Sequence, residues 1–294
     1  MTLARRKLLQ LVGLLGAPTV FLLFFFLCPL LIMLVYSFLT PGLYGGVEWQ
    51  FSHLNYGRIL GWANTRYEKF DPVFLSIFLR SLRLAALTVV TSLLVSYPAA
   101  FWISRMSPGR RDFAIFLVTL PFFVSLIVRL FAWVLILRPT GVLNQGLMGI
   151  GLTSEPIEFL YSDFAVILGM TYVFIPFMFL PLYASIEKLD VAQLEASSDL
   201  GATRFQTFRK VVLPATMPGI IGGGIITFIP ALGNFIVPSV LGGAKVLMIG
   251  NLIEQQFLSA RNWPFGSALA MLVMTAVLVL LVVQLRLARR EEAS

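Results

Sequence analysis

The chain has 294 residues, of which 58% are hydrophobic and only 12% charged, and its mean hydropathy is +0.89. Soluble domains carry about 25% charged residues, so this composition excludes a water-soluble protein and indicates a bilayer. One Cys and one His exclude a disulfide framework and a His/Cys metal cluster. Basic loops beside lipid headgroups account for the net charge of +8, so we expect no nucleic acid partner.

Long apolar runs predict membrane-spanning helices, since about 20 residues at about 1.5 Å each cross about 30 Å of hydrocarbon. The first run follows Arg5, Arg6 and Lys7 and is too long for the apolar core of a cleaved signal peptide, so we expect a retained anchor. No polar stretch is long enough to fold separately, which predicts a single transmembrane domain over residues 1–294. The predicted spans are residues 12–38, 82–104, 113–137, 163–185, 216–241 and 265–286.

Basic residues between these spans indicate their orientation. The short loop SPGRRD at 107–112 is strongly basic, and the loop at 186–215 and both chain ends carry further Lys and Arg. By the positive-inside rule, we expect both termini and the 186–215 loop in the cytoplasm. On the other side, residues 39–81 predict an interfacial piece, whereas 138–162 and 242–264 each predict a short apolar helix.

The long cytoplasmic loop is a polar segment with helical patterning. Asp190 followed by Gln193, and Thr203 followed by Gln206, each have the spacing of a helix N-cap with its reciprocal partner. Gly201 lies where a residue in the left-handed conformation ends a helix. The pattern therefore predicts two short helices hinged at Gly201.

The same loop then leads into the fifth span, at an entry marked by Pro214 and Pro218. Its small residues Ala196 and Ser197, next to Glu195, allow close approach of another protein. The residues alone leave two interpretations open. The helix pair either docks on a partner protein or lies on the membrane surface with its apolar side in the headgroups.

This loop resembles the EAA loop of permease subunits in ABC-type importers that use a substrate-binding protein. The resemblance implies an all-α integral membrane protein of the type I importer (MetI-like) fold, with six transmembrane helices and a cytoplasmic coupling-helix elbow. Ser197 stands where the family has a second Ala, and Val211 where it has Ile. The matching positions are Glu195, Ala196, Gly201, Leu213 and Pro214, and Ser197, Asp199 and Phe205 complete the coupling residues that the resemblance implies.

The resemblance also implies partners and a location. They are an ATPase dimer that binds ATP and Mg²⁺, a second homologous permease, a periplasmic or extracellular substrate-binding protein, and the lipid of the bacterial inner membrane. The chain itself is expected to bind no cofactor or metal and to catalyse no reaction alone. The segments at 181–190, 216–223, 241–251 and 262–268 are similar to PotB-type spermidine/putrescine permeases. This implies polyamine transport, with an opine, a phosphonate or another organic cation as alternatives.

The solute path has few carboxylates to offer a polycation. Within the predicted spans the sequence places no Asp or Glu except Asp163, at an end. Aromatic faces can bind cations by up to about 2 kcal/mol when desolvated. The fifth span is rich in Gly and Pro, as interrupted helices that line cavities are, although Gly219 and Gly223 could equally form a close helix contact. The candidate path residues are Trp133, Tyr172, Phe174, Phe228, Asn234 and Phe235.

Arg129 is the one strong charge well inside a predicted span, and we expect it to form a structural ion pair or carbonyl contacts with the partner permease, with a role in the solute path as the alternative. The sequence lacks the residues that other classes of protein would need. The segment around Lys245 has neither the spacing nor the hydroxyl of a phosphate-binding loop. A secondary transporter would need more ionisable residues at membrane depth and an inverted repeat, and an intramembrane enzyme would need a catalytic dyad.

Overall fold

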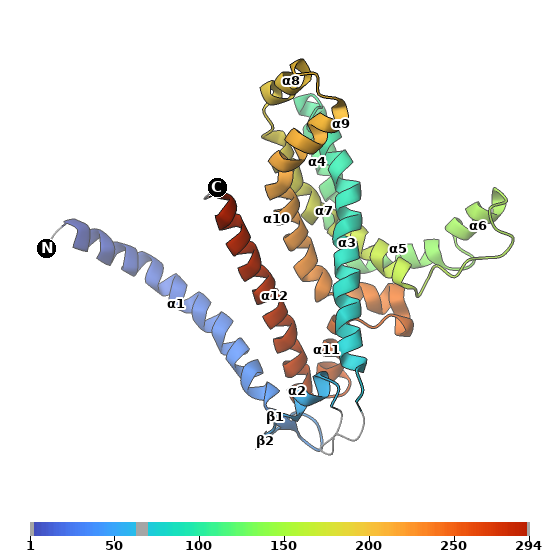
Figure 1. The fold of residues 1–294 in the computed structure, drawn as a ribbon. Coiled ribbons are helices and arrows are strands. Elements are labelled where there is room, and N and C mark those ends of the chain that lie inside the picture. The colour runs from blue at the N-terminus through green and yellow to red at the C-terminus, as the bar shows by residue number, and fades with distance from the viewer. Residues whose placement is uncertain (1–2, 63–69, 293–294) are drawn as a thin grey trace. The chain divides into compact units, whose positions relative to one another are not determined.

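The computed structural model describes residues 3–62 and 70–292, and helices dominate it (Figure 1). Within the described residues, six helical segments are long and apolar enough to cross a membrane, which confirms the predicted helical membrane fold. They are Pro18–Ser37, Val73–Ile103, Leu126–Gly149, Asp163–Glu187, Arg204–Leu232 and Trp263–Gln284. The chain forms two compact units, one made of Met1–Leu75 with Leu252–Ser294 and the other of Ser76–Asn251.

The first unit contains two long helices, α1 (Leu3–Ser37) and α12 (Trp263–Glu292), which contact each other. Helix α1 is followed in this unit by β1 (Leu39–Pro41), β2 (Val47–Phe51) and α2 (Leu54–Ile59). The two strands form an antiparallel hairpin that pairs Thr40 with Glu48. The sequence did not indicate this hairpin, because its strands have three and five residues and lack a clear alternation of apolar and polar side chains.

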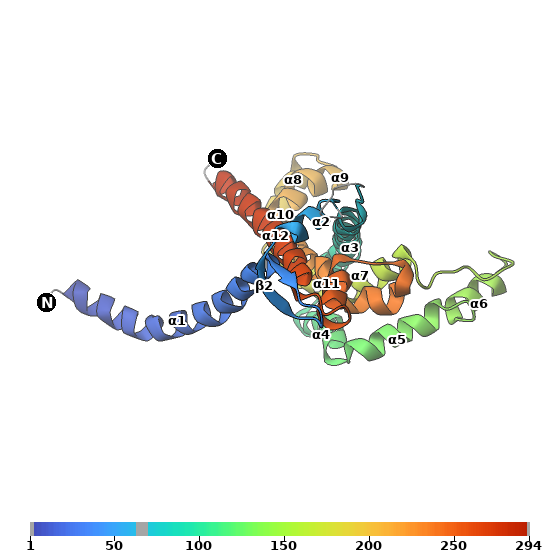
Figure 2. The same cartoon turned by 90° about the horizontal axis from the view of Figure 1, so that it is seen from below.

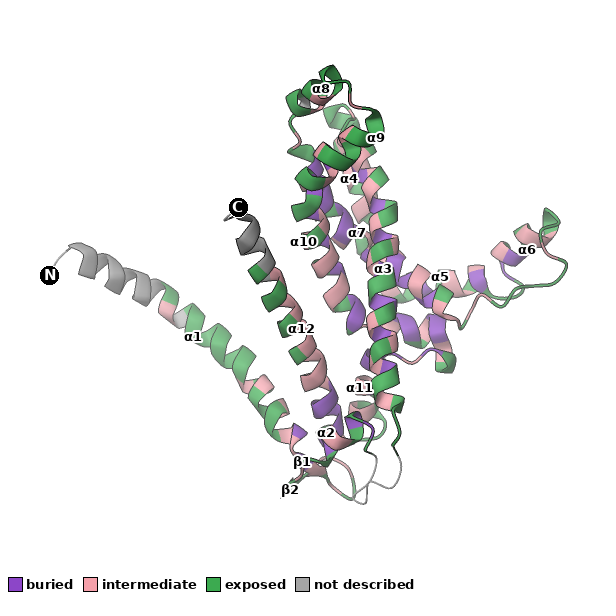
Figure 3. Ribbon diagram, viewed as in Figure 1, coloured by how far each residue is buried: buried purple, intermediate pink, exposed green. Residues whose placement is uncertain are grey.

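The second unit is a helix bundle in which α3 (Val73–Ile103), α7 (Asp163–Glu187) and α10 (Leu213–Leu232) lie side by side, as Figure 2 also shows. Burial is concentrated on α7, which packs most extensively against α10 (Figure 3). Phe179, Leu182 and Ile186 of α7 form an apolar core with Ala100 and Ile103 of α3.

The predicted third span at 113–137 is not one helix. The structure divides it into α4 (Pro108–Thr119), a 3₁₀ turn (Leu120–Phe123) and α5 (Leu126–Leu137), which α6 (Val142–Gly149) follows. Pro121 lies in the 3₁₀ turn, and a proline has no N–H to continue a helix. Figures 1 and 2 show α5 and α6 extending away from the α3–α7–α10 bundle.

The predicted fifth span at 216–241 also differs from the structure. Helix α10 ends at Leu232, and the turn at Gly233 and the irregular residues Asn234 and Phe235 precede a new helical segment that begins at Ile236. The Oδ1 of Asn234 accepts a hydrogen bond from the Val237 N–H at 2.9 Å and so caps the new segment. A π turn (Pro238–Gly242), a 3₁₀ turn (Gly243–Lys245) and α11 (Ile249–Leu258) complete this region.

Candidate coupling elbow and solute path

The elbow begins where α7 ends, at Glu187, and its first helix is α8 (Val191–Asp199). Asp190 caps α8, because its Oδ1 accepts a hydrogen bond from the Ala192 N–H at 2.9 Å. The expected return contact from the Gln193 side chain is not seen among the described residues. Instead, the Gln193 backbone N–H donates to the Asp190 carbonyl at 3.2 Å.

Gly201 ends α8 in the manner that the sequence predicts. Its φ is +76°, a left-handed conformation, and a side chain there would meet no atom within 4 Å. The Gly201 N–H donates to the Ser198 carbonyl at 2.9 Å, and the Ala202 N–H donates to the Ser197 carbonyl at 3.1 Å. This pair of bonds is the Schellman motif, so the backbone conformation, and not a lack of space, favours glycine at this position.

The second helix of the elbow starts with the predicted capping box. The Gln206 N–H donates to Thr203 Oγ1 at 3.3 Å, and the Thr203 N–H donates to Gln206 Oε1 at 2.8 Å. Helix α9 (Arg204–Thr207) then continues through a π turn (Phe208–Val212) directly into α10. The helix therefore enters the fifth span at Arg204, and Pro214 lies inside a continuous helical run.

Two hydroxyl groups join the two arms of the elbow. Ser197 Oγ on α8 lies 2.7 Å from Thr207 Oγ1 on α9, a hydrogen-bond distance. An alanine at 197, the family's residue, would remove this bond. Between the arms lies an open groove of about 490 Å³, lined by Gln193, Ala196, Ser197, Leu200, Ala202, Gln206, Lys210 and Val211.

The elbow also carries exposed apolar and acidic side chains. Leu200 is 88% exposed and Phe205 is 70% exposed. Large apolar side chains exposed together often mark a surface that binds another protein. Glu195 and Asp199 are also exposed, and neither carboxylate has an ion pair within the described residues. A groove with apolar and acidic groups around it has the character of a protein-docking surface.

The elbow is connected to two membrane helices at its base. The rings of Phe208 and Tyr97 on α3 meet edge to face, with centroids 5.6 Å apart. The Tyr97 hydroxyl lies 3.0 Å from Thr216 Oγ1 on α10. The elbow is therefore continuous with α10 and contacts α3 through Tyr97.

Tyr97 and Thr216 were not among the predicted site residues. They stand 119 positions apart, and neither belongs to a local pattern, so no signal in the sequence indicates their contact. Of the predicted coupling residues, Glu195, Ala196, Ser197, Asp199, Gly201 and Phe205 lie together on the elbow, whereas Leu213 and Pro214 lie beyond the π turn.

The predicted path residues do not form one cluster. Trp133 on α5 and Tyr172 on α7 meet edge to face with centroids 5.7 Å apart, and both are half-buried. Phe174 is only 4% exposed and packs in the protein interior. Phe228 is half-buried on α10, Asn234 caps the following helix and Phe235 is exposed beyond the turn, so only Trp133 and Tyr172 come into contact.

Arg129 joins this pair. Its guanidinium Cζ lies 5.9 Å from the centroid of the Tyr172 ring, within the range of a cation–π contact. The expected ion pair is not found: within the described residues Arg129 has no acidic partner, and its buried Nε has no hydrogen-bond acceptor. Its carbonyl contacts with a partner permease remain a prediction.

The glycines of the fifth span form a close helix contact. A Cβ on Gly219 would lie 2.5 Å from Ser185 Cβ and 2.9 Å from the Pro181 carbonyl oxygen on α7. A Cβ on Gly223 would lie 3.0 Å from the Met178 carbonyl oxygen. These positions are required for packing of α10 on α7, as small residues are in membrane helix pairs.

At the end of the bundle away from the elbow, charges hold α3 to the start of α7. Asp163 forms ion pairs with Arg80, through Oδ1, and with Arg83, through Oδ2 at 2.6 Å. The other Arg80 nitrogen donates to the Lys245 carbonyl at 3.2 Å. Among the described residues, no group of three or more His, Cys, Asp and Glu side chains is placed to hold a metal ion.

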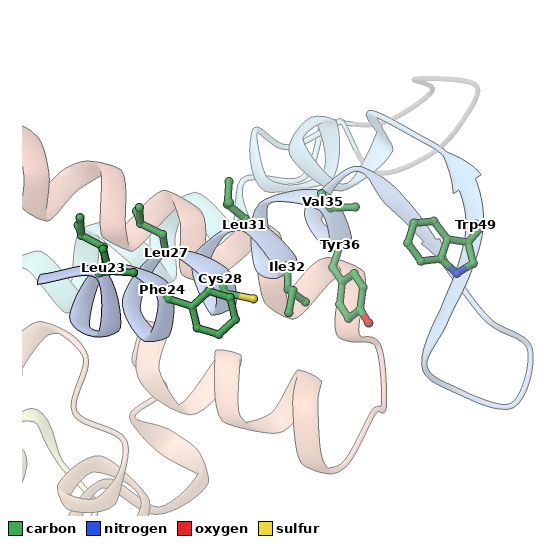
Figure 4. A pocket seen from close by; sticks show the side chains of 10 residues that line it. Leu23, Phe24, Leu27, Cys28, Leu31, Ile32, Val35, Tyr36 and Trp49 are labelled. Carbon is green, nitrogen blue, oxygen red and sulfur yellow. The ribbon is translucent and has the colours of Figure 1, made fainter. Parts of the chain in front are cut away.

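Helix α1 presents a broad apolar surface. In the most apolar 18 residues of the segment Pro18–Ser37 no residue is buried, and the exposed side chains include Phe21, Phe24 and Phe25. Figure 4 shows how α1 side chains and Trp49 line an open groove of about 800 Å³. Since lipid tails cover such surfaces, this side of α1 fits a bilayer environment.

A helical membrane bundle with an exposed elbow fits a transport permease, and comparison with known proteins shows the family. Residues 110–291 match the family "binding-protein-dependent transport system inner membrane component". The chain belongs to this family and is thus a multi-pass inner-membrane permease subunit, not an enzyme by itself.

The chain is similar in sequence to spermidine/putrescine permeases. The chain is 41% identical to the PotB permease of Haemophilus influenzae over 89% of this chain and 87% of the relative. It is 37% identical to PotB of Escherichia coli K12, over 91% and 94% of the two chains. The Escherichia coli permease YdcU is 36% identical over 68% of this chain and 67% of the relative.

Solved structures support the fold. A bacterial ABC transporter that imports the acidic polysaccharide alginate matches with a TM-score of 0.70 at 22% identity, covering 98% of this chain and 99% of that one. The alginate transporter in complex with its pentasaccharide-bound periplasmic protein matches with a TM-score of 0.69 at 20% identity, covering 97% and 96%. At this identity the likeness shows the fold, and the importer family works with a binding protein.

Proposed function

We propose that this chain is the permease of an ATP-driven importer that carries polyamines such as spermidine and putrescine across the inner membrane. The observation that carries the proposal is the identity of 41% and 37% to two spermidine/putrescine permeases over 89% and 91% of the chain. The aromatic pair of Trp133 and Tyr172 supports it, since ring faces attract alkylammonium groups.

In this mechanism a separate ATPase dimer binds ATP and Mg²⁺ and receives the elbow in a cleft. Leu200, Phe205 and Glu195 make the contact, and closure of the ATPase moves the elbow. The π turn and the Tyr97 contact carry that movement into α10 and α3. A second homologous permease completes the path, which opens alternately to either side, and a substrate-binding protein delivers the solute from outside.

The test is uptake of labelled spermidine, putrescine and a phosphonate into proteoliposomes that hold the complete transporter with ATP inside. We expect ATP-dependent uptake of both polyamines and none of the phosphonate. If only the phosphonate were taken up, the assignment of polyamines as substrates would be wrong, whereas the assignment as an importer would stand. An ATPase should co-purify with the chain, whereas ATP-independent counterflow by the chain alone would contradict the importer mechanism.

Coupling has its own test in the same proteoliposomes. Glu195→Ala and Gly201→Pro should leave membrane insertion intact and reduce uptake per ATP hydrolysed by about tenfold or more, because each alters the elbow and not the membrane bundle. Normal import by the Gly201→Pro complex would show that the elbow does not couple ATP hydrolysis to transport.

A further inference from the structure

Arg129 covers an aromatic face that a cationic solute would otherwise use. Its guanidinium lies over the Tyr172 ring with Cζ 5.9 Å from the centroid, and Trp133 meets the same ring edge to face at 5.7 Å. All three side chains are half-buried, so the cluster is neither sealed in the core nor fully open. Arg129 Nε is buried without an acceptor among the described residues, which leaves the guanidinium held mainly by the ring.

The position of Arg129 in its helix gives the guanidinium a second possible contact, at the helix break. The Arg129 N–H donates to the Ser125 carbonyl at 3.2 Å, so Arg129 belongs to the first turn of α5, directly after the helix break. Long side chains on a helix lean toward its N-terminus, here toward the 3₁₀ turn Leu120–Phe123. The last carbonyl groups of a helix have no partner within it and can accept from a cation.

The break lies directly before Leu126–Gly149, a segment long and apolar enough to cross a membrane. Within the hydrocarbon, irregular backbone is tolerated only where protein buries it or where it lines a water-filled cavity. Ser125 at the break is exposed in this chain, and Val124 is 45% exposed. An exposed break beside a membrane span fits a surface that a second permease completes or that lines the path between the two.

Building on the polyamine transport proposed above, we propose that Arg129, Tyr172 and Trp133 form a site for an alkylammonium group. The guanidinium of Arg129 occupies the Tyr172 face until an ammonium group of the solute replaces it. Ring faces attract both cations. Two unit charges about 6 Å apart at an effective dielectric constant of about 20 disfavour joint occupancy by on the order of 100-fold, so the two cations exchange.

This exchange explains how a site with no carboxylate among its described residues binds a polycation briefly. Each ammonium group gains the ring face and Trp133 beside it, and the return of Arg129 displaces the group again. One positive charge remains on the ring throughout, and no proton is transferred. Arg129 thus sets the affinity of the site low enough for release.

The first test measures equilibrium binding of labelled spermidine to the detergent-solubilised complete transporter without its binding protein. Arg129→Met keeps the length of the apolar stem and removes the charge, so spermidine affinity should rise about tenfold. Arg129→Lys keeps the charge and should stay within about threefold of the unmodified complex. Arg138→Met is the matched control, because Arg138 is exposed at the other end of α5.

The second test uses the ring. Tyr172→Leu should weaken spermidine binding about tenfold, whereas Tyr172→Phe keeps the aromatic face and should bind as the unmodified complex does. The two Tyr172 variants also test the site if the complex with Arg129→Met does not assemble. Equal binding by the Leu and Phe variants, or by the Met and Lys variants, would overturn the exchange site. A complex that transports no polyamine at all would instead overturn the proposed function.

Discussion

At the scale of single residues, the elbow depends on backbone conformation more than on side-chain contacts. Gly201 has a φ of +76° and open space where a Cβ would stand. The left-handed conformation costs about 1–2 kcal/mol for most residues and less for Asn, whose side chain tolerates it. Because a side chain has room at position 201, substitutions there test the backbone conformation and not the available space.

We predict that Gly201→Asn keeps uptake within about twofold of the unmodified transporter, whereas Gly201→Val, which is β-branched, lowers it about tenfold. The measurement is ATP-driven uptake in proteoliposomes, with protein insertion compared by gel. Equal activity of the Asn and Val variants would show that the left-handed turn is dispensable.

The elbow also shows what a sequence can reveal about single residues. The caps at Asp190 and Thr203 and the turn at Gly201 follow from side chains within a few positions of one another, and the structure has all three. The contacts that join elements, such as Tyr97 with Thr216, depend on how distant helices pack. Arg129 illustrates the same limit, because its partner proved to be an aromatic ring 43 positions away rather than an acid.

At the scale of elements, proline and glycine were visible in the sequence but their effects were harder to predict. Pro121 breaks the predicted third span, yet Pro214 leaves α9 and α10 continuous. The difference lies in the π turn, in which the Leu213 N–H donates to the Phe208 carbonyl one position earlier than in an α-helix. Such a turn places Pro214 where its missing N–H is accommodated.

The contact between α7 and α10 gives a second prediction. Gly219→Ala should lower the stability of the bundle by roughly 1–3 kcal/mol, since the added Cβ would overlap Ser185 and the Pro181 carbonyl oxygen. Gly222→Ala is the control, because a Cβ there meets nothing within 4 Å and alanine favours the helix. Thermal unfolding of the two variants in detergent measures the difference, and equal loss in both would mean that α7 and α10 do not pack through Gly219.

The ion pairs between α3 and α7 give a third prediction. Asp163 holds two arginines, of which Arg80 is 34% exposed and Arg83 is 62% exposed at the side chain. Exposed pairs contribute about 0–1 kcal/mol, so Arg83→Gln should have little effect on stability. Asp163→Asn leaves both guanidinium groups without their carboxylate and should lower the unfolding temperature clearly more. A similar shift for both variants would assign the stabilisation to Arg83 instead.

At the scale of the whole molecule, the chain exposes three kinds of surface. The apolar side of α1 fits lipid, the elbow presents Leu200 and Phe205 beside carboxylates that have no ion pair within the described residues, and the break before α5 exposes Phe122, Phe123 and Val124. The last two are unfavourable for an isolated protein and become favourable in an assembly. The composition could indicate the membrane and the loop pattern could indicate partners, whereas the side chains left exposed for those partners are identified only in the structure.

The orientation of the chain is the last prediction, and it follows from the basic loops. We expect the elbow and both termini in the cytoplasm and the loop after α6 outside. Cys28 is replaced by Ser, and a single cysteine is then introduced either at Ser198 on the elbow or at Ser154 in the loop, both exposed positions. In intact spheroplasts a membrane-impermeant maleimide should label the cysteine at 154 and leave that at 198 unlabelled until the membrane is opened. Labelling of 198 in intact cells would invert the topology and remove the elbow from the reach of a cytoplasmic ATPase.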